Sequence, residues 1–127
     1  MKNKLDKKYD DNIINALKKL PTPLLTFDDV QVYFEENKRN ETIFEHIANK
    51  KHHFCVSDIS CVPFILKDKN SLQTDKKKSR FRNYVGKRRK RNDKAKYIKI
   101  ITRSSGHNKE VVTSIYLVKE KVEKRKK

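Results

Sequence analysis

Glycine and cysteine are both scarce in this chain, with two residues of each among 127. Two glycines leave no glycine-rich loop of the kind that cradles nucleotide phosphates. Two cysteines give no disulfide framework, and no apolar run approaches the roughly 18 residues of a membrane span. We also find no hydrophobic segment of a signal peptide. These absences predict an intracellular protein that makes no membrane contact.

Acidic residues are scarce in the second half. Residues 1–70 contain twelve Lys or Arg and eleven Asp or Glu, a net charge of +1. Residues 71–127 contain 21 and five, a net charge of +16, and the two halves sum to the +17 of the chain. The basic half therefore has no compact group of carboxylates for magnesium, and no nucleophile motif is present. We expect neither an enzyme nor a bound cofactor.

Basic side chains are instead abundant and clustered. An AT-rich coding sequence would account for part of the lysine, since the chain has 25 Lys, ten Asn and ten Ile but three Ala. Such a bias does not explain why Arg80, Arg82, Arg88, Arg89 and Arg91, five of eight arginines, lie within twelve positions. The guanidinium fork suits phosphates and guanine edges. The pattern therefore indicates nucleic acid as the partner.

The first half has helical patterns. Apolar residues from Leu5 to Leu20 recur every three or four positions, and Pro21 and Pro23 end that helix. Thr26, with an acid three positions later, predicts a capped helix over residues 27–37. Asn40 is placed to cap a short helix over residues 41–49.

The second half is mixed. Residues 54–56 indicate a short strand, Ser57 or Asp58 could cap another helix, and polar residues 67–75 indicate a loop. Phe81, Tyr84 and Val85 have helical spacing, which predicts an amphipathic basic helix within residues 76–96. Residues 97–102 and 111–118 are β-branched runs that predict a hairpin with a long polar loop.

The order of these elements predicts an α+β fold, a small helical domain followed by a β-hairpin. It is the order of a winged helix-turn-helix domain, and another mixed α+β topology is the alternative. We expect one domain over residues 1–118, with a near-neutral helical half (1–50) and a basic half (51–118). The basic tail, residues 119–127, is expected to be disordered.

The predicted function is that of a small DNA-binding factor in transcription or replication, with DNA favoured over RNA. The basic helix would grip duplex phosphates while the hairpin acts as a wing. The alternative is an RNA-binding or structural adaptor subunit of a transcription or ribonucleoprotein assembly, and the apolar helices could support self-association. The residues predicted to contact nucleic acid are Lys76, Lys77, Lys78, Arg80, Arg82, Asn83, Lys87, Arg88, Arg89, Lys90, Arg91, Lys94, Lys96, Arg103, His107 and Lys109. Among them Arg82, Arg89 and Asn83 are the candidates for reading base edges.

Three simpler or rival interpretations accompany this one. KRRKR (87–91) and KRKK (124–127) could be a solvated run or a nuclear-targeting signal, and without such targeting the protein would stay in the cytoplasm. Phe81 and Tyr84 could stack on unpaired bases, although their spacing favours core anchors. His52, His53, Cys55 and Cys61 could hold zinc, but their spacing is unusual for a structural site.

Overall fold

The computed structural model describes residues 8–35, 37–38, 41–74, 80–89 and 95–119. Its α-helices are α1 (Asp11–Lys18), α2 (Ile43–Ala48) and α3 (Val56–Lys67), with short 3₁₀ turns at Lys50–His52 and Lys69–Ser71. Its strands are β1 (Leu24–Leu25), β2 (Gln31–Phe34), β3 (Asn37–Lys38), β4 (Glu41–Thr42), β5 (Leu72–Thr74), β6 (Phe81–Lys87), β7 (Tyr97–Gly106) and β8 (Lys109–Val118). None of the described helices is long and apolar enough to cross a membrane.

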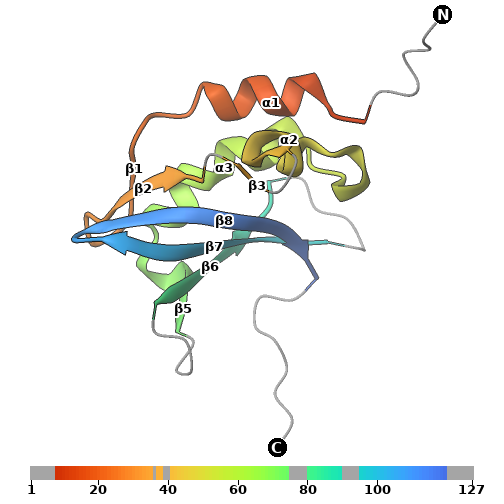
Figure 1. The fold of residues 1–127 in the computed structure, drawn as a ribbon. Coiled ribbons are helices and arrows are strands. Elements are labelled where there is room, and N and C mark those ends of the chain that lie inside the picture. The colour runs from red at the N-terminus through yellow and green to blue at the C-terminus, as the bar shows by residue number, and fades with distance from the viewer. Residues whose placement is uncertain (1–7, 36, 39–40, 75–79, 90–94, 120–127) are drawn as a thin grey trace, which may run out of the picture.

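Six strands form one curled sheet in the order β1-β2-β8-β7-β6-β5 (Figure 1). Neighbours are antiparallel except β2 and β8, which run parallel, with Val32 opposite Glu110 and Phe34 opposite Val112. β3 and β4 form a separate two-stranded ribbon. The mixed α+β class is therefore confirmed, but the winged helix-turn-helix arrangement is not, because a sheet dominates the fold.

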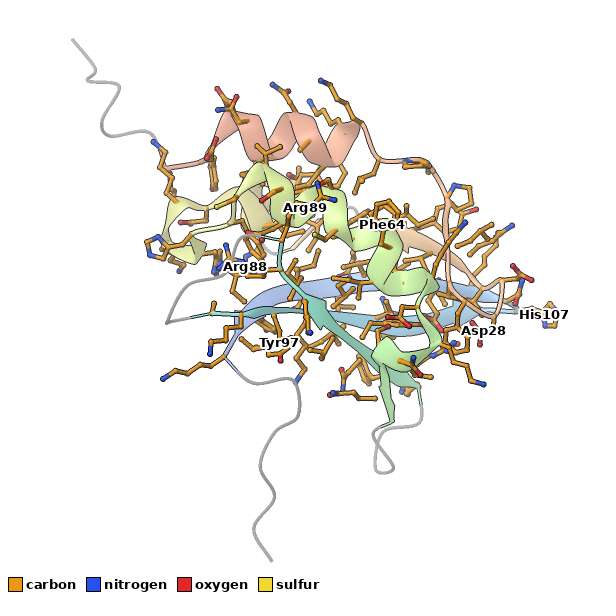
Figure 2. All side chains as sticks on the ribbon, turned by 180° about the vertical axis from the view of Figure 1, so that it is seen from behind. Asp28, Phe64, Arg88, Arg89, Tyr97 and His107 are labelled. Atoms are coloured by element: carbon orange, nitrogen blue, oxygen red, sulfur yellow. The ribbon has the colours of Figure 1, made fainter. Side chains whose placement is uncertain are left out.

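All three α-helices pack on the same face of this sheet. In the view of Figure 2, α3 crosses in front of the strands, and α1 lies beside it. The core that they enclose includes Ile13 and Leu17 of α1, Ile47 of α2, and Val62 and Leu66 of α3. From the sheet it receives Tyr84, Ile98, Ile100, Val112 and Ile115. The other face of the sheet has no helix over it in the described part of the chain (Figures 1 and 2).

Two predicted helices are confirmed, and their ends follow from hydrogen bonds that cap them. Asp10 begins α1 by accepting a hydrogen bond from the Asn12 N–H at 2.9 Å. At the start of α2, Thr42 and Glu45 form a reciprocal capping box, each side chain accepting from the other's backbone N–H at 3.0 Å. The cap is thus Thr42 and not the predicted Asn40, which lies outside the described residues.

The helix predicted over residues 27–37 is wrong. Thr26 does accept a hydrogen bond from a backbone N–H, that of Val30 at 3.0 Å, but this bond closes a turn between β1 and β2. Asp29, with φ 64°, takes the left-handed conformation that reverses the chain there. The residues that predict a helix cap therefore form a tight turn, because in both structures a hydroxyl accepts a hydrogen bond from a nearby backbone N–H.

The predicted basic helix is also wrong, because residues 81–87 form strand β6 in the middle of the sheet. Tyr84 pairs with Ile100 and Val85 with Lys99, so the two side chains point to opposite faces, and both are buried. Because β6 has buried side chains on both faces, the spacing of its apolar residues resembles the apolar stripe of a helix. The short strand predicted at residues 54–56 is absent too, since α3 already begins at Val56, and residues 72–74 of the predicted loop form β5.

The C-terminal hairpin is confirmed and is longer than predicted. β7 and β8 extend through most of the expected polar loop, so only His107 and Asn108 make the turn. Gly106, with φ 139°, and Asn108, with φ 58°, supply the positive φ angles that such a tight turn requires. Residues 120–127 of the predicted disordered tail lie outside the described residues.

Gly86 provides a test of how α3 seats on the sheet, because a Cβ atom there would lie 2.4 Å from Cγ1 of Ile65. We expect Gly86→Ala to lower the free energy of unfolding by about 1–3 kcal/mol, since β6 and α3 must move apart. In an Ile65→Ala background the same substitution should cost clearly less. Urea unfolding of the four proteins measures this coupling, and equal costs in both backgrounds would contradict it.

Candidate nucleic-acid interface

The helix-free face of the sheet is built by strict alternation along the strands. On β7, Ile98, Ile100 and Thr102 are buried toward the helices, whereas the odd-numbered residues between them point away. The cross-strand register extends this second set over β6, β8 and β2. The residues of this helix-free face include Tyr33, Phe81, Asn83, Val85, Lys87, Tyr97, Lys99, Ile101, Arg103, Lys109, Val111, Tyr116 and Val118.

The charges on the helix-free face are nearly all positive. Lys87, Lys99, Arg103 and Lys109 point to it, and no strand residue that does so is acidic in the described part of the sheet. Glu35, which follows β2 directly, lies 3.4 Å from Arg103 and neutralises that one cation. Three lysines thus remain for an anionic ligand, and Lys109 also lies over the Tyr33 ring, 5.9 Å from its centroid.

Arg88 was predicted to contact nucleic acid, but its side chain is only 3% exposed and is committed to the protein interior (Figure 2). It donates to both carboxylate oxygens of Asp58, at 2.8 and 2.9 Å, and to the carbonyl oxygen of Ala95 at 3.2 Å. The hydrogen bond and the charge of Asp58 raise the pKa of Arg88. Arg88 therefore ties β6 to the start of α3, and its assignment as a phosphate contact is corrected.

Arg82 is likewise engaged within the protein, on the helix-covered side. Its guanidinium donates to Glu110 at 2.8 Å and to Asp28 at 3.2 Å, and lies over the rings of Phe27 and Tyr84. Burial works to lower the pKa of Arg82, but interactions with Tyr84, Glu110 and Asp28 outweigh it and raise that pKa. Its predicted role in reading bases is therefore corrected, because its donors are held by two carboxylates.

Glu110 is the buried centre of that cluster. Its carboxylate accepts hydrogen bonds from the hydroxyls of Thr102 at 2.7 Å and Tyr84 at 3.1 Å, besides the one from Arg82. These donors come from β6 and β7, so one carboxylate fixes the register of three strands. Tyr84, fully buried, is thus a core anchor, whereas Phe81 lies half-buried on the helix-free face.

Asp28 closes the exposed end of the same cluster. Partial burial works against its ionisation, but the hydrogen bond from the Thr26 hydroxyl and the charge of Arg82 outweigh this and lower the pKa of Asp28. An arginine held between Asp28 and Glu110 is thus neutralised from both sides.

The other predicted contact residues fall into three groups. Arg80, Lys87, Arg89, Lys96, His107 and Lys109 are exposed. Asn83 is half-buried on the helix-free face, and Arg103 lies there beside Glu35. Lys76, Lys77, Lys78, Lys90, Arg91 and Lys94 lie outside the described residues. Figure 2 places His107 at the tip of the β7–β8 hairpin, away from Tyr97 at its other end.

Sequence reasoning missed Lys99, Tyr97 and Tyr116 on this face. A signal was present in the run from Tyr97 to Thr102. Its even-numbered residues are all β-branched, and its odd-numbered residues include Tyr97 and Lys99. Assigning the faces of the hairpin would have placed Tyr97 and Lys99 together. The spacing of Phe81, Tyr84 and Val85 predicts a helix in place of β6, and a helix there would share no face with the hairpin.

The candidate zinc residues do not form a metal site in the described structure, where no three His, Cys, Asp or Glu side chains gather suitably. Cys61 is buried on α3, and Cys55 precedes that helix with its sulfur 3.7 Å from Nη2 of Arg88. His52 lies near the rings of His46, at 5.3 Å, and Phe54, at 6.4 Å. Packing and capping therefore account for these positions.

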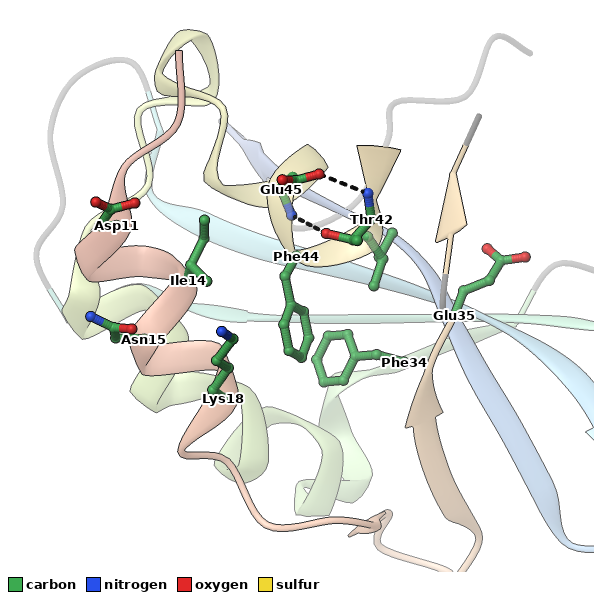
Figure 3. A pocket seen from close by; sticks show the side chains of 10 residues that line it. Asp11, Ile14, Asn15, Lys18, Phe34, Glu35, Thr42, Phe44 and Glu45 are labelled. Carbon is green, nitrogen blue, oxygen red and sulfur yellow. Dashed lines mark hydrogen bonds between the residues drawn. The ribbon is translucent and has the colours of Figure 1, made fainter. Parts of the chain in front are cut away.

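A groove of about 560 Å³ lies on the helical side, between α1, β2 and α2. Phe34 and Phe44 meet edge to face at its floor, with ring centroids 5.3 Å apart (Figure 3). The side chains of Asp11, Lys18 and Glu45 surround them. This surface is apolar and partly acidic, and so differs from the basic helix-free face.

Comparisons of this chain with protein-family models, with curated proteins and with solved structures find no match. The functional argument accordingly depends on the geometry and charge described above.

The buried Arg88–Asp58 pair makes a sharp prediction for stability. Arg88→Met should lower the free energy of unfolding by about 3–5 kcal/mol, because Asp58 would stay buried without its counter-charge. Combining it with Asp58→Asn should restore part of this loss. The control is Arg89→Met, an exposed neighbour that should change stability by at most about 0.5 kcal/mol. Strictly additive single and double variants in urea unfolding would refute the pairing.

Tyr84 predicts a pH dependence. Burial, followed by the neighbouring charge of Glu110, raises the pKa of Tyr84 above its ordinary 10.0. The folded protein then keeps a proton that the unfolded chain releases, so stability is fully present below pH 10.0 and declines as the pH rises above it. Between pH 10 and 11, wild type should lose about 1 kcal/mol more than Tyr84→Phe. Parallel losses in urea unfolding at the two pH values would contradict this.

Proposed function

We propose that this protein is a non-enzymatic nucleic-acid-binding protein that holds the sugar-phosphate backbone on the helix-free face of its sheet. The observation that carries this proposal is the charge of that face, where Lys87, Lys99 and Lys109 have no acidic neighbour on the strands that the structure describes. In the connections on either side of β6, Arg80 and Lys96 are exposed as well. Phosphate neutralisation by such lysines supplies affinity that falls steeply with salt.

The mechanism differs from the insertion of a basic helix into a groove. Residues 81–87 form an extended strand, so they present alternate side chains to the ligand, and a broad sheet surface replaces the recognition helix. Lys96 and Arg80 are exposed next to the ends of β7 and β6 and extend the positive field of that surface, whereas Arg89 is exposed on the helical side (Figure 2). The strands position the cations, and the cations bind phosphates irrespective of sequence.

An adaptor subunit of a larger transcription or ribonucleoprotein assembly is the second candidate. The groove floored by Phe34 and Phe44 favours it, because an apolar floor with carboxylates at its rim suits a basic protein segment with an apolar side chain. In that case nucleic acid and a protein partner would occupy opposite sides of the molecule. Binding of nucleic acid alone would then be uniform across sequences and erased by moderate salt.

A set of charge-matched variants tests the proposed surface. Replacing Lys87, Lys99 and Lys109 with Gln should weaken binding and flatten the slope of log K against log salt, by about 0.7 per contact on single strands and about 0.9 on duplex DNA. The matched control replaces Lys18, Lys19 and Lys67, which are exposed on the helical side, and removes the same charge. Fluorescence anisotropy over a salt series gives both slopes. Equal slopes for the two triple variants would refute the assigned surface.

A further inference from the structure

Three aromatic side chains on the helix-free face have a cation directly across a strand pair. Tyr97 of β7 lies opposite Lys87 of β6, Tyr116 of β8 lies opposite Lys99 of β7, and Phe81 of β6 lies opposite Arg103 of β7. Residues directly opposite each other in an antiparallel pair have Cβ atoms about 4.5–5.5 Å apart. The face therefore repeats one ring opposite one cationic side chain three times, and in the third pair Glu35 neutralises Arg103.

Two of these pairs are adjacent. Val118 is the partner of Tyr97, so Tyr116, two residues earlier on β8, is its diagonal neighbour. Diagonal Cβ atoms are about 7–8 Å apart, which aromatic side chains can span. Tyr116 is 43% exposed, a large fraction for an aromatic residue, and it stands among the few large apolar side chains that the described structure leaves exposed. The third pair lies farther along the sheet, about 20 Å from Tyr97 at the usual strand rise.

A ring that stacks and a cation that neutralises are the two contacts that an unpaired nucleotide offers, through its base and its phosphate. A duplex offers only the phosphates to such a face, because the faces of its bases are stacked on one another. A protein surface would need anionic groups next to apolar ones at the same repeat. We infer that the ligand of the helix-free face is a single-stranded polynucleotide whose bases stack on Tyr97 and Tyr116 while Lys87 and Lys99 hold its phosphates.

This inference rests on the proposed function and specifies its ligand. Stacking on aromatic rings is tolerant of sequence, since every base has a flat face. Single-stranded RNA and single-stranded DNA share this chemistry, and oligonucleotides of the same sequence in both forms tell them apart through the 2′-hydroxyl. Binding of either form in preference to its duplex supports the inference.

The decisive variants keep the apolar character but remove the ring. Tyr97→Leu and Tyr116→Leu should each lower the affinity for single strands by roughly 5- to 150-fold, while duplex binding and the salt slope stay unchanged. Tyr97→Phe and Tyr116→Phe keep the ring and should bind as wild type does. The matched control is Phe64→Leu, since Phe64 is an aromatic residue 71% exposed on α3, on the other side of the sheet.

A second readout reports stacking directly. The chain contains five tyrosines and no tryptophan, so its intrinsic fluorescence comes from tyrosine, and a stacked base should quench it. Quenching by single strands should diminish in the two Leu variants and persist in Phe64→Leu. Urea unfolding of each variant, measured alongside, establishes that it is folded.

The outcomes separate this inference from the function on which it rests. If the lysine variants flatten the salt slope while the Leu variants bind single strands normally, the surface is right and stacking is wrong. A wild-type preference for duplex would also overturn the inference. If the two lysine triple variants cannot be distinguished, the proposed function itself fails.

Discussion

The buried contact between Arg88 and Asp58 is the interaction on which the rest of this fold depends. It joins the end of β6 to the first turn of α3, and Arg88 also binds the Ala95 carbonyl just before β7. Asp58 accepts a further hydrogen bond from the Cys55 N–H at 2.7 Å, which begins the helix. The Arg88 side chain thereby joins both ends of the connection between β6 and β7, and its ion pair with Asp58 seats α3 on the sheet. A strongly basic chain uses its few buried acids, Asp58 and Glu110, to neutralise arginines that the fold needs inside.

Local patterns sufficed for the elements whose partners are close in the chain. The helices around Ile13 and Ile47 and the terminal hairpin follow from spacing, caps and β-branched runs. The two wrong helices have different causes. β2 forms through its pairing with β8, almost eighty residues later. β6 pairs with β5 and β7, which are near in the chain, but the burial of Tyr84 and Val85 on opposite faces hides its period of two. The spacing of apolar residues within a short segment reveals neither a distant strand partner nor burial on both faces.

The candidate site shows the same limit more sharply. The clustering of arginine was a sound indication of an important region, but two of its members, Arg82 and Arg88, bind carboxylates about thirty residues away. Composition cannot distinguish an arginine that binds a ligand from one that is buried in an ion pair, because the difference lies in the tertiary partner. Lys87 and Lys109, whose ammonium groups are more strongly hydrated, are exposed, and Lys99 is half-buried. Their common face could have been deduced only once β6 was known to be a strand.

The position of β8 has a consequence for how the molecule is made. β8 is the last strand in the described part of the chain, yet it lies inside the sheet between β7 and β2. On the ribosome, β2 is synthesised almost eighty residues before its parallel neighbour. Contacts so distant in sequence slow folding, since a long loop must close before they form. The insertion of β8 between β7 and β2 therefore completes the hydrophobic interior and the basic helix-free face in a single step.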